Sequence, residues 1–220
     1  MIEATYIDHM GNDLTIVNSA RVSFGKKSDW IQRVYSGEPQ LLHNKDIKLI
    51  HYLAKHNHKS PFNHVFTTFH VKAPIFVARQ LVKHEYMPWN EISRRYVDSD
   101  PKLYYPDEWR GRSSDKKQGS EGVVKVDGRV ALGSVMNNCL ELYYDLLKLG
   151  VAPEQARMVL PQSTMTEWYW SGSLYAFAKM CGLRLQDDAQ YETRLVAEQI
   201  EDVMMKLYPV SWEALRMYAE

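Results

Sequence analysis

The chain of 220 residues has only two cysteines, no excess of charge of either sign and no long apolar run. Lys plus Arg and Asp plus Glu both number 27, so the formal net charge is zero. A general nucleic-acid binder is therefore disfavoured, because it needs a basic excess to displace counterions from phosphates. No segment approaches the roughly 18 apolar residues that span a membrane. With 45 % hydrophobic residues, the composition predicts a soluble globular protein, and a small anionic ligand stays open.

The two cysteines give no sign of reactivity. Cys139 and Cys181 both lie in apolar, helix-like contexts, and no Cys-x-x-Cys spacing or signal peptide is present. We therefore expect a reducing, cytoplasmic location and interpret both thiols as packing residues.

Several common catalytic patterns are also missing. No glycine-rich dinucleotide or P-loop pattern occurs, which disfavours Rossmann and P-loop nucleotide binding. Ser93 has no identifiable base at a fixed offset, so a nucleophilic serine site has no support. Eight histidines invite a metal interpretation, but their spacings do not form a tetrahedral set, and we expect no metal. A loop histidine such as His58 is better suited to hydrogen bonding with a ligand.

Periodicity predicts an α+β fold. We expect strands at 1–8 and 13–18 joined by a turn at 10–13, a strand at 65–76, and helices at 44–55, 75–84, 132–147, from Pro153, 164–181, 189–207 and 211–219. The sequence thus predicts a small antiparallel sheet packed with a helix-dominated remainder, in one domain spanning 1–220. Residues 110–129 hold four of the eleven glycines and many charges, which predicts a flexible loop.

The stretch 79–96, RQLVKHEYMPWNEISRRY, concentrates polar and charged side chains in every direction of a helix. Pro88 must interrupt any helix through its middle, because proline lacks the N–H group and clashes with the preceding turn. Functional groups on both sides of a forced break indicate a candidate ligand site. The alternative is a solvated loop that joins two helices.

Arginines beside amide and acid groups strengthen the ligand hypothesis. Gln80 precedes Glu91, Ser93 and Arg95 in this stretch, and two further arginines lie at 157 and 184. Guanidinium groups suit phosphate, while amide and hydroxyl groups can read a base edge or a sugar hydroxyl. The simpler interpretation of the two distant arginines is surface or capping residues at helix ends.

These motifs resemble those of the flavin-dependent thymidylate synthases. The family signature is Arg-His-Arg, seven residues, then Ser, within a pattern that ends Asn-Glu-x-Ser-x-Arg-Tyr. Here the frame is Lys83-His84-Glu85, seven residues, then Ser93, with 90–96 (NEISRRY) intact. Further similar segments lie at 20–24, 58–62, 69–80, 156–161 and 183–192, so the resemblance covers most of the chain.

The resemblance implies conversion of dUMP to dTMP with methylenetetrahydrofolate as carbon donor, while NADPH reduces bound FAD. It also implies a homotetramer with active sites where subunits meet. The dUMP positions are Gln80, Glu91, Ile92, Ser93, Arg94, Arg95, Arg157 and Arg184. The FAD positions are Ser23, Ser60, Lys83, His84, Glu85, Glu91, Ser173, Lys179 and Asp188. The positions implied to be catalytic are His58, Ser93 and Arg184.

The signature triplet departs from the family. Lys83 and Glu85 replace two arginines, and lysine cannot reproduce a bidentate contact. We expect Lys179 to restore the lost positive charge beside the flavin. Two alternatives remain: a relative that methylates or hydroxymethylates another pyrimidine nucleotide such as dCMP, and a non-catalytic paralogue that binds nucleotide without FAD.

Overall fold

The computed structural model describes residues 1–31, 41–97, 100–115, 119–127 and 131–218. Its strands are β1 (Glu3–Met10), β2 (Phe66–Pro74), β3 (Trp89–Glu91), β4 (Arg110–Arg112), β5 (Ser120–Val123) and β6 (Met165–Ser173). Its helices and 3-10 turns are α1 (Asp13–Arg21), η1 (Val22–Phe24), α2 (Asn44–Lys55), η2 (Ser60–His64), α3 (Ile75–Leu81), α4 (Leu132–Lys148), α5 (Pro153–Ala156), η3 (Arg157–Val159), α6 (Leu174–Arg184), α7 (Tyr191–Leu207) and α8 (Pro209–Met217).

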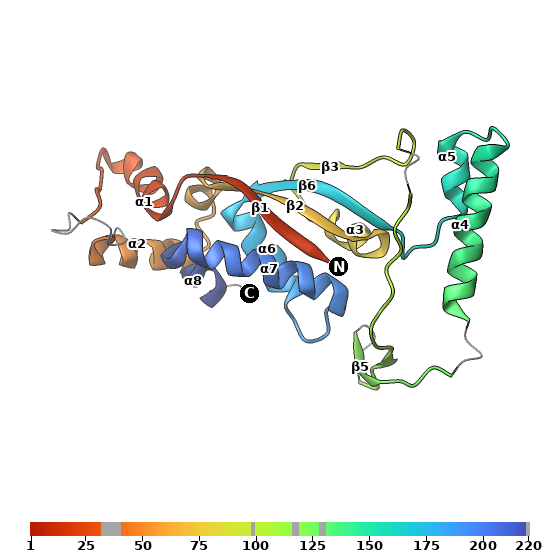
Figure 1. Cartoon of the computed structure of the whole chain (residues 1–220). Helices are drawn as coiled ribbons and strands as arrows, with labels where there is room; N and C mark the ends of the chain where they lie inside the picture. Colours follow the sequence, from red (N-terminus) through yellow and green to blue (C-terminus); the bar gives the residue numbers. More distant parts are fainter. Residues whose placement is uncertain (32–40, 98–99, 116–118, 128–130, 219–220) are drawn as a thin grey trace.

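An antiparallel sheet in the order β1-β2-β6-β3 forms the centre of the molecule (Figure 1). Buried and less buried residues alternate along β2, and Phe69 and Val71 are fully buried. Alternation of this kind buries one face of a sheet and leaves the other half-exposed. The helices α3, α6 and α7 contact the sheet and cover its buried face. The α+β class and the antiparallel sheet are thereby confirmed.

A second layer joins the two ends of the chain. The helix α8 packs against α2, α6 and α7. Its N-terminus is capped from α1, because the buried carboxylate of Asp13 accepts hydrogen bonds from the backbone N–H groups of Val210 (3.1 Å) and Ser211 (3.0 Å). An acid at this end of a helix satisfies donors that have no partner within the helix.

The helices α4 and α5 stand apart from this body (Figure 1). They pack against each other and against η3, and the segment that contains β4 and β5 leads to them from β3. Apolar side chains remain exposed on this unit, including Val135 at 60 % and Met158 at 79 %. None of the helices in the described ranges is both long and apolar enough to cross a membrane.

The predicted strand at 13–18, and with it the hairpin turn at 10–13, is wrong. This segment is α1, which begins with a capping box: Asn12 accepts a hydrogen bond from the Thr15 backbone N–H, and the Thr15 hydroxyl faces the Asn12 backbone N–H. Gly11 precedes it with a φ of 84°. The buried pair Ile16 and Val17 also fits a helix that packs one face inward.

The predicted helix at 164–181 is wrong in its first half, which is β6. Thr166, Trp168, Trp170 and Gly172 are buried in alternation with less buried neighbours, so the segment follows the two-residue period of a strand. The helix α6 starts only at Leu174, where the Ser173 hydroxyl accepts from the Ala176 backbone N–H. The helices predicted at 44–55, 75–84, 132–147, 189–207 and 211–219 are confirmed within a few residues at their ends.

The segment 110–129 contains regular structure that the sequence did not predict. β4 and β5 form an antiparallel pair, with Arg112 opposite Ser120. Residues 116–118 and 128–129 of the predicted loop lie outside the described residues. The hairpin is anchored on the body through Arg110, whose guanidinium donates to Glu192 at the start of α7.

Candidate active site

The helix that enters the polar stretch 79–96 ends at Leu81, well before Pro88, the residue predicted to interrupt it. The helix α3 begins after Pro74 and ends at Leu81, and an irregular turn follows in which the exposed Tyr86 has a φ of 59°. Proline then directs the chain into β3, which pairs with Trp168–Trp170 of β6. The signature triplet at 83–85 therefore lies in the turn, and the motif at 90–96 begins on the edge strand.

His84 of the triplet contacts Arg184 at the end of α6. The Arg184 Nε donates to His84 Nε2 over 3.1 Å, and Arg184 Nη2 donates to the backbone carbonyl of Gln80 over 3.4 Å. Burial, followed by the positive charges of Arg184 and Lys179, lowers the pKa of His84 to about 4. His84 is thus a neutral acceptor that holds the guanidinium, and Lys179 lies close enough to affect its charge.

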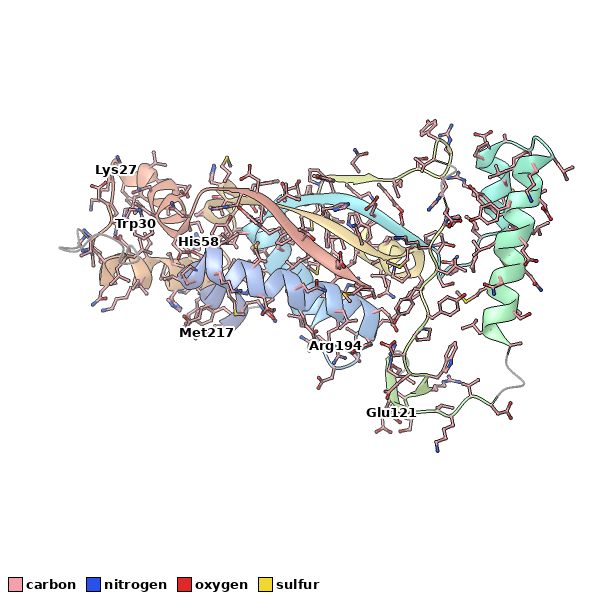
Figure 2. The ribbon with its side chains drawn as sticks, viewed as in Figure 1. Lys27, Trp30, His58, Glu121, Arg194 and Met217 are labelled. Atoms are coloured by element: carbon pink, nitrogen blue, oxygen red, sulfur yellow. The ribbon has the colours of Figure 1, made fainter. Side chains whose placement is uncertain are left out.

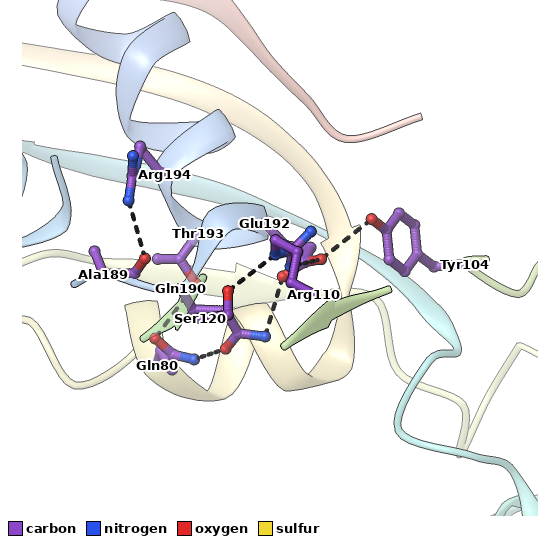
Figure 3. Close-up of polar contacts among 9 residues, drawn as sticks. All are labelled: Gln80, Tyr104, Arg110, Ser120, Ala189, Gln190, Glu192, Thr193 and Arg194. Atoms are coloured by element: carbon purple, nitrogen blue, oxygen red, sulfur yellow. Dashed lines mark hydrogen bonds and ion pairs between the residues drawn. The ribbon is translucent and has the colours of Figure 1, made fainter. Parts of the chain in front are cut away.

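The side chain of Gln80 is held by the first turn of α7 (Figure 3). Its Nε2 donates to Gln190 Oε1, and its Oε1 accepts from the Thr193 hydroxyl over 3.3 Å. Gln190 Nε2 donates in turn to the buried Glu192 over 3.2 Å. Gln80 and Arg184, which are 104 positions apart in sequence, therefore meet beside α7.

Glu91 is fixed at the end of β3 by two donors. Its Oε1 accepts from the Thr166 hydroxyl over 2.6 Å, and its Oε2 accepts from Trp89 Nε1 over 3.1 Å. Trp89 itself stacks on Trp168, with ring centroids 4.3 Å apart and planes 17° apart. The carboxylate is exposed but its position is set by the sheet, which suits a group that must meet a ligand.

Arg95 and Arg157 both contact Glu154 of α5, and Ser93 contacts Arg95. The Ser93 hydroxyl accepts from the Arg95 backbone N–H over 3.3 Å. Arg95 Nε lies 3.6 Å from the Glu154 carboxylate, and Arg157 Nε donates to the Glu154 backbone carbonyl over 3.2 Å. Glu154 thus contacts two exposed guanidinium groups, one from the polar stretch and one from the distant motif at 156–161.

The predicted nucleotide residues therefore form two groups by their contacts. Gln80 and Arg184 lie at the end of α3 and α6, and Glu91, Ser93, Arg95 and Arg157 lie along β3 and α5. Ile92 continues the ladder by donating its backbone N–H to the Glu167 carbonyl, and Arg94 follows in the next turn.

The predicted FAD residues are distributed along α6 and at the α1–α2 end of the molecule. Ser173 starts α6, where its buried hydroxyl also bonds Asn63 of η2 over 2.7 Å, and Lys179 lies farther along the same helix. Ser23 in η1, Ser60 in η2 and His58 are exposed, and Figure 2 shows His58 at that end. Lys83 and Glu85 are exposed in the turn beside His84, while Asp188 lies next to Gly119 of the β4–β5 hairpin.

Six residues of this region were not predicted from sequence. Gln190, Glu192 and Thr193 hold Gln80, directly or through one another, and the first two lie in the 183–192 segment, where the motif contains both residues. Tyr104 and Arg110 contact Glu192, and Thr166 contacts Glu91. No motif marks these last three, because their partners are far away in sequence.

A cavity of about 280 Å³ adjoins this network, between the body and α4. Tyr104, Arg110, Gln190 and Glu192 line it together with apolar residues of α3 and α4. Burial and then the charge of Glu192 raise the pKa of Tyr104 to about 12, so its hydroxyl is a donor. No cluster of three or more His, Cys, Asp or Glu residues able to hold a metal occurs among the described residues.

Comparison with known proteins places this chain among named relatives. The family model described as thymidylate synthase complementing protein matches residues 5–210. A flavin-dependent thymidylate synthase of Thermus thermophilus is 39 % identical over 209 residues, which are 94 % of this chain and 73 % of that protein. One of Thermosipho africanus is 36 % identical over 220 residues, covering 97 % and 90 %.

A solved structure is similar over the whole fold. The UMP/dUMP methylase PolB from Streptomyces cacaoi, bound with 5-Br dUMP, superposes with a TM-score of 0.83 and 31 % identity over 99 % of this chain and 96 % of that one. Family match, sequence identity and fold agree, and the chain belongs to the thymidylate synthase complementing protein family.

Proposed function

We propose that this protein is a flavin-dependent thymidylate synthase. It converts dUMP to dTMP, takes the carbon from methylenetetrahydrofolate, and uses FAD that NADPH reduces. Family membership, the names of the relatives and the motif at 90–96 support the proposal.

The contact of Arg184 with His84 and Gln80 is the observation that carries this proposal. C5 of uracil is a poor nucleophile, so the ring must gain electron density before it attacks a carbon donor. A fixed guanidinium can stabilise the negative charge that develops on the pyrimidine, because its position requires no reorganisation during the reaction. His84 and the Gln80 carbonyl supply that fixed position.

The cysteines offer no alternative activation of the ring. Addition of a thiolate at C6 requires an accessible thiol of lowered pKa. Cys181 is fully buried, and burial raises the pKa of its thiol. Cys139 lies on α4, which stands apart from the body that carries Arg184 (Figure 1). Electrostatic activation by Arg184 is therefore the route that the residues favour.

The residues at the FAD positions fit an anionic dinucleotide. Lys83 and Lys179 are exposed cations near His84, and Ser23 and Ser60 offer exposed hydroxyls. Glu85 is exposed and can turn to solvent, so its charge does not exclude a diphosphate. When bound, FAD supplies the hydride that completes the methyl group. The protein's part is to hold FAD and to keep Arg184 oriented.

Assembly as a homotetramer is part of the proposal. The α4–α5 unit packs on little of the body and exposes apolar residues that a second copy of the chain can cover. Arg157 lies beside this unit, which brings a phosphate-binding group to the subunit boundary.

A second candidate is a methylase that accepts ribonucleotides. The similar solved structure is a UMP/dUMP methylase, and it is also known bound with 5-Br UMP. The altered triplet at 83–85 leaves room for such divergence, as for action on dCMP or for loss of FAD.

The test is a substrate comparison with FAD-loaded protein, methylenetetrahydrofolate and NADPH. We expect dTMP from dUMP and no product from dCMP, with UMP measured in parallel. Methylated or hydroxymethylated product from dCMP alone would refute the proposed substrate. A purified protein with no flavin absorbance after FAD is supplied would instead favour the non-catalytic paralogue.

A further inference from the structure

A chain of side-chain hydrogen bonds leads from the β4–β5 hairpin to Gln80 (Figure 3). Arg110 Nη2 donates to Glu192 Oε1 over 2.6 Å, and the Tyr104 hydroxyl donates to the same oxygen over 3.4 Å. Glu192 Oε2 accepts from Gln190 Nε2. The Glu192 side chain is only 4 % exposed, so these donors are its surroundings rather than solvent.

The carboxylate fixes the direction of the chain. A glutamate paired with arginine accepts hydrogen bonds and donates none, so Gln190 must turn its NH2 group towards Glu192. Gln190 is the N-cap residue of α7, but its side chain makes no capping bond, which leaves the amide free for this contact. Its carbonyl oxygen then faces Gln80 and accepts from it.

The orientation of the Gln80 amide follows from this. Its NH2 group faces Gln190, and its oxygen accepts from the Thr193 hydroxyl. One N–H of Gln80 remains to be offered elsewhere. An amide turned by 180° has the same shape but presents acceptor and donor in exchanged places.

We infer that Glu192 is a positioning residue that acts through Gln190 to set the amide orientation of Gln80, and so presents an N–H donor to an acceptor oxygen of the bound pyrimidine nucleotide. This inference rests on the proposed function, because Gln80 is placed at the nucleotide by the family resemblance. Glu192 itself does not touch the nucleotide.

The substitution Glu192→Gln tests the direction of the chain at constant size. The new amide keeps its oxygen towards Arg110 and Tyr104, since both donate. Its NH2 group therefore faces Gln190, which must turn, and Gln80 turns with it. We expect dUMP to bind about tenfold more weakly, which corresponds to one hydrogen bond lost.

A matched control lies on the same helix. Glu201 of α7 accepts from Arg216 over 2.8 Å, so Glu201→Gln removes a comparable ion pair without touching Gln80. The dissociation constant of dUMP is measured by calorimetry on FAD-loaded protein for wild type, Glu192→Gln, Gln80→Met, their double variant and Glu201→Gln. Thermal unfolding of each variant is recorded in parallel.

The inference predicts that Glu192→Gln weakens dUMP binding in wild type but adds nothing to Gln80→Met, because the effect passes through Gln80. Equal weakening in both backgrounds, or wild-type affinity of Glu192→Gln, overturns it. If Glu192→Gln fails to fold, Gln190→Met breaks the same chain and leaves the Arg110–Glu192 pair in place. Wild-type affinity of Gln190→Met then overturns the inference. A wild-type protein that binds no dUMP contradicts the proposed function, and the inference falls with it.

Discussion

Arg184 donates a hydrogen bond from Nε to Nε2 of His84, 3.1 Å away and 100 positions earlier in the chain. The bond requires that Nε2 of His84 carries no proton. The position of Arg184, the proposed catalytic cation, therefore depends on the charge state of His84.

The first prediction concerns pH. His84 has a folded-state pKa of about 4, below its ordinary value of 6.5. The unfolded chain therefore binds more protons between these values, and the stability that neutral His84 contributes is present above pH 6.5 and is lost as the pH falls towards 4. The variant His84→Gln keeps an acceptor but does not titrate.

The measurement is the free energy of unfolding by denaturant as a function of pH. We expect wild type to lose more stability than His84→Gln between pH 6.5 and 4. Identical curves for the two proteins would mean that His84 titrates normally in the folded state.

The second prediction concerns Thr166, whose hydroxyl donates to Glu91. Thr166→Val keeps the shape of the side chain and frees Glu91 to move, so we expect the KM for dUMP to rise about fivefold, from the loss of one hydrogen bond. Thr164→Val is the control, because that buried hydroxyl donates to the Pro161 carbonyl. Steady-state kinetics in which both variants change KM alike would remove the role of Thr166 as support for Glu91.

The contact between Thr166 and Glu91 is also an example of what the sequence does not predict. Periodicity identifies β2 and α7, because their alternation and amphipathicity lie within one segment. Periodicity gives the wrong prediction at 164–173, because the aromatic residues there have helical spacing. The segment forms a strand because it pairs with β2. Likewise the motif supplies Glu91, but its donor is set by the register of β3 on β6, which has no local signal.

The strand predicted at 13–18 was wrong for a different reason. Its β-branched residues Ile16 and Val17 favour a strand, but the capping box at Asn12 and Thr15 starts a helix whose apolar pair packs in the core. Gln80 and Arg184 come from motifs, and the structure adds that they meet.

The third prediction concerns the altered triplet. Lys179 lies close enough to His84 to affect its pKa, in keeping with a role as substitute cation beside Lys83. We expect Lys179→Ala to retain less FAD after purification, measured as the ratio of flavin to protein absorbance. Lys206→Ala, on the exposed side of α7, is the control. Normal FAD content in Lys179→Ala would show that no compensation operates.

The fourth prediction concerns assembly. Leu142 on α4 is 49 % exposed in the single chain, on the unit that we propose to be covered by a second copy. Leu142→Glu places a charge in that contact, so light scattering should show a shift from tetramer towards smaller species. Glu141→Gln, at the neighbouring exposed position, should leave the mass unchanged. An unchanged mass for Leu142→Glu would place the subunit contact elsewhere.

Release of tritium from C5 of labelled dUMP reports the proposed methylation itself, because replacement of that hydrogen is the net reaction at the pyrimidine. The assay uses FAD-loaded protein with methylenetetrahydrofolate and NADPH, and Arg184→Ala as the variant without the activating cation. We expect tritium release by wild type and a loss of at least about a hundredfold in Arg184→Ala. No release by FAD-loaded wild type that binds dUMP would contradict it.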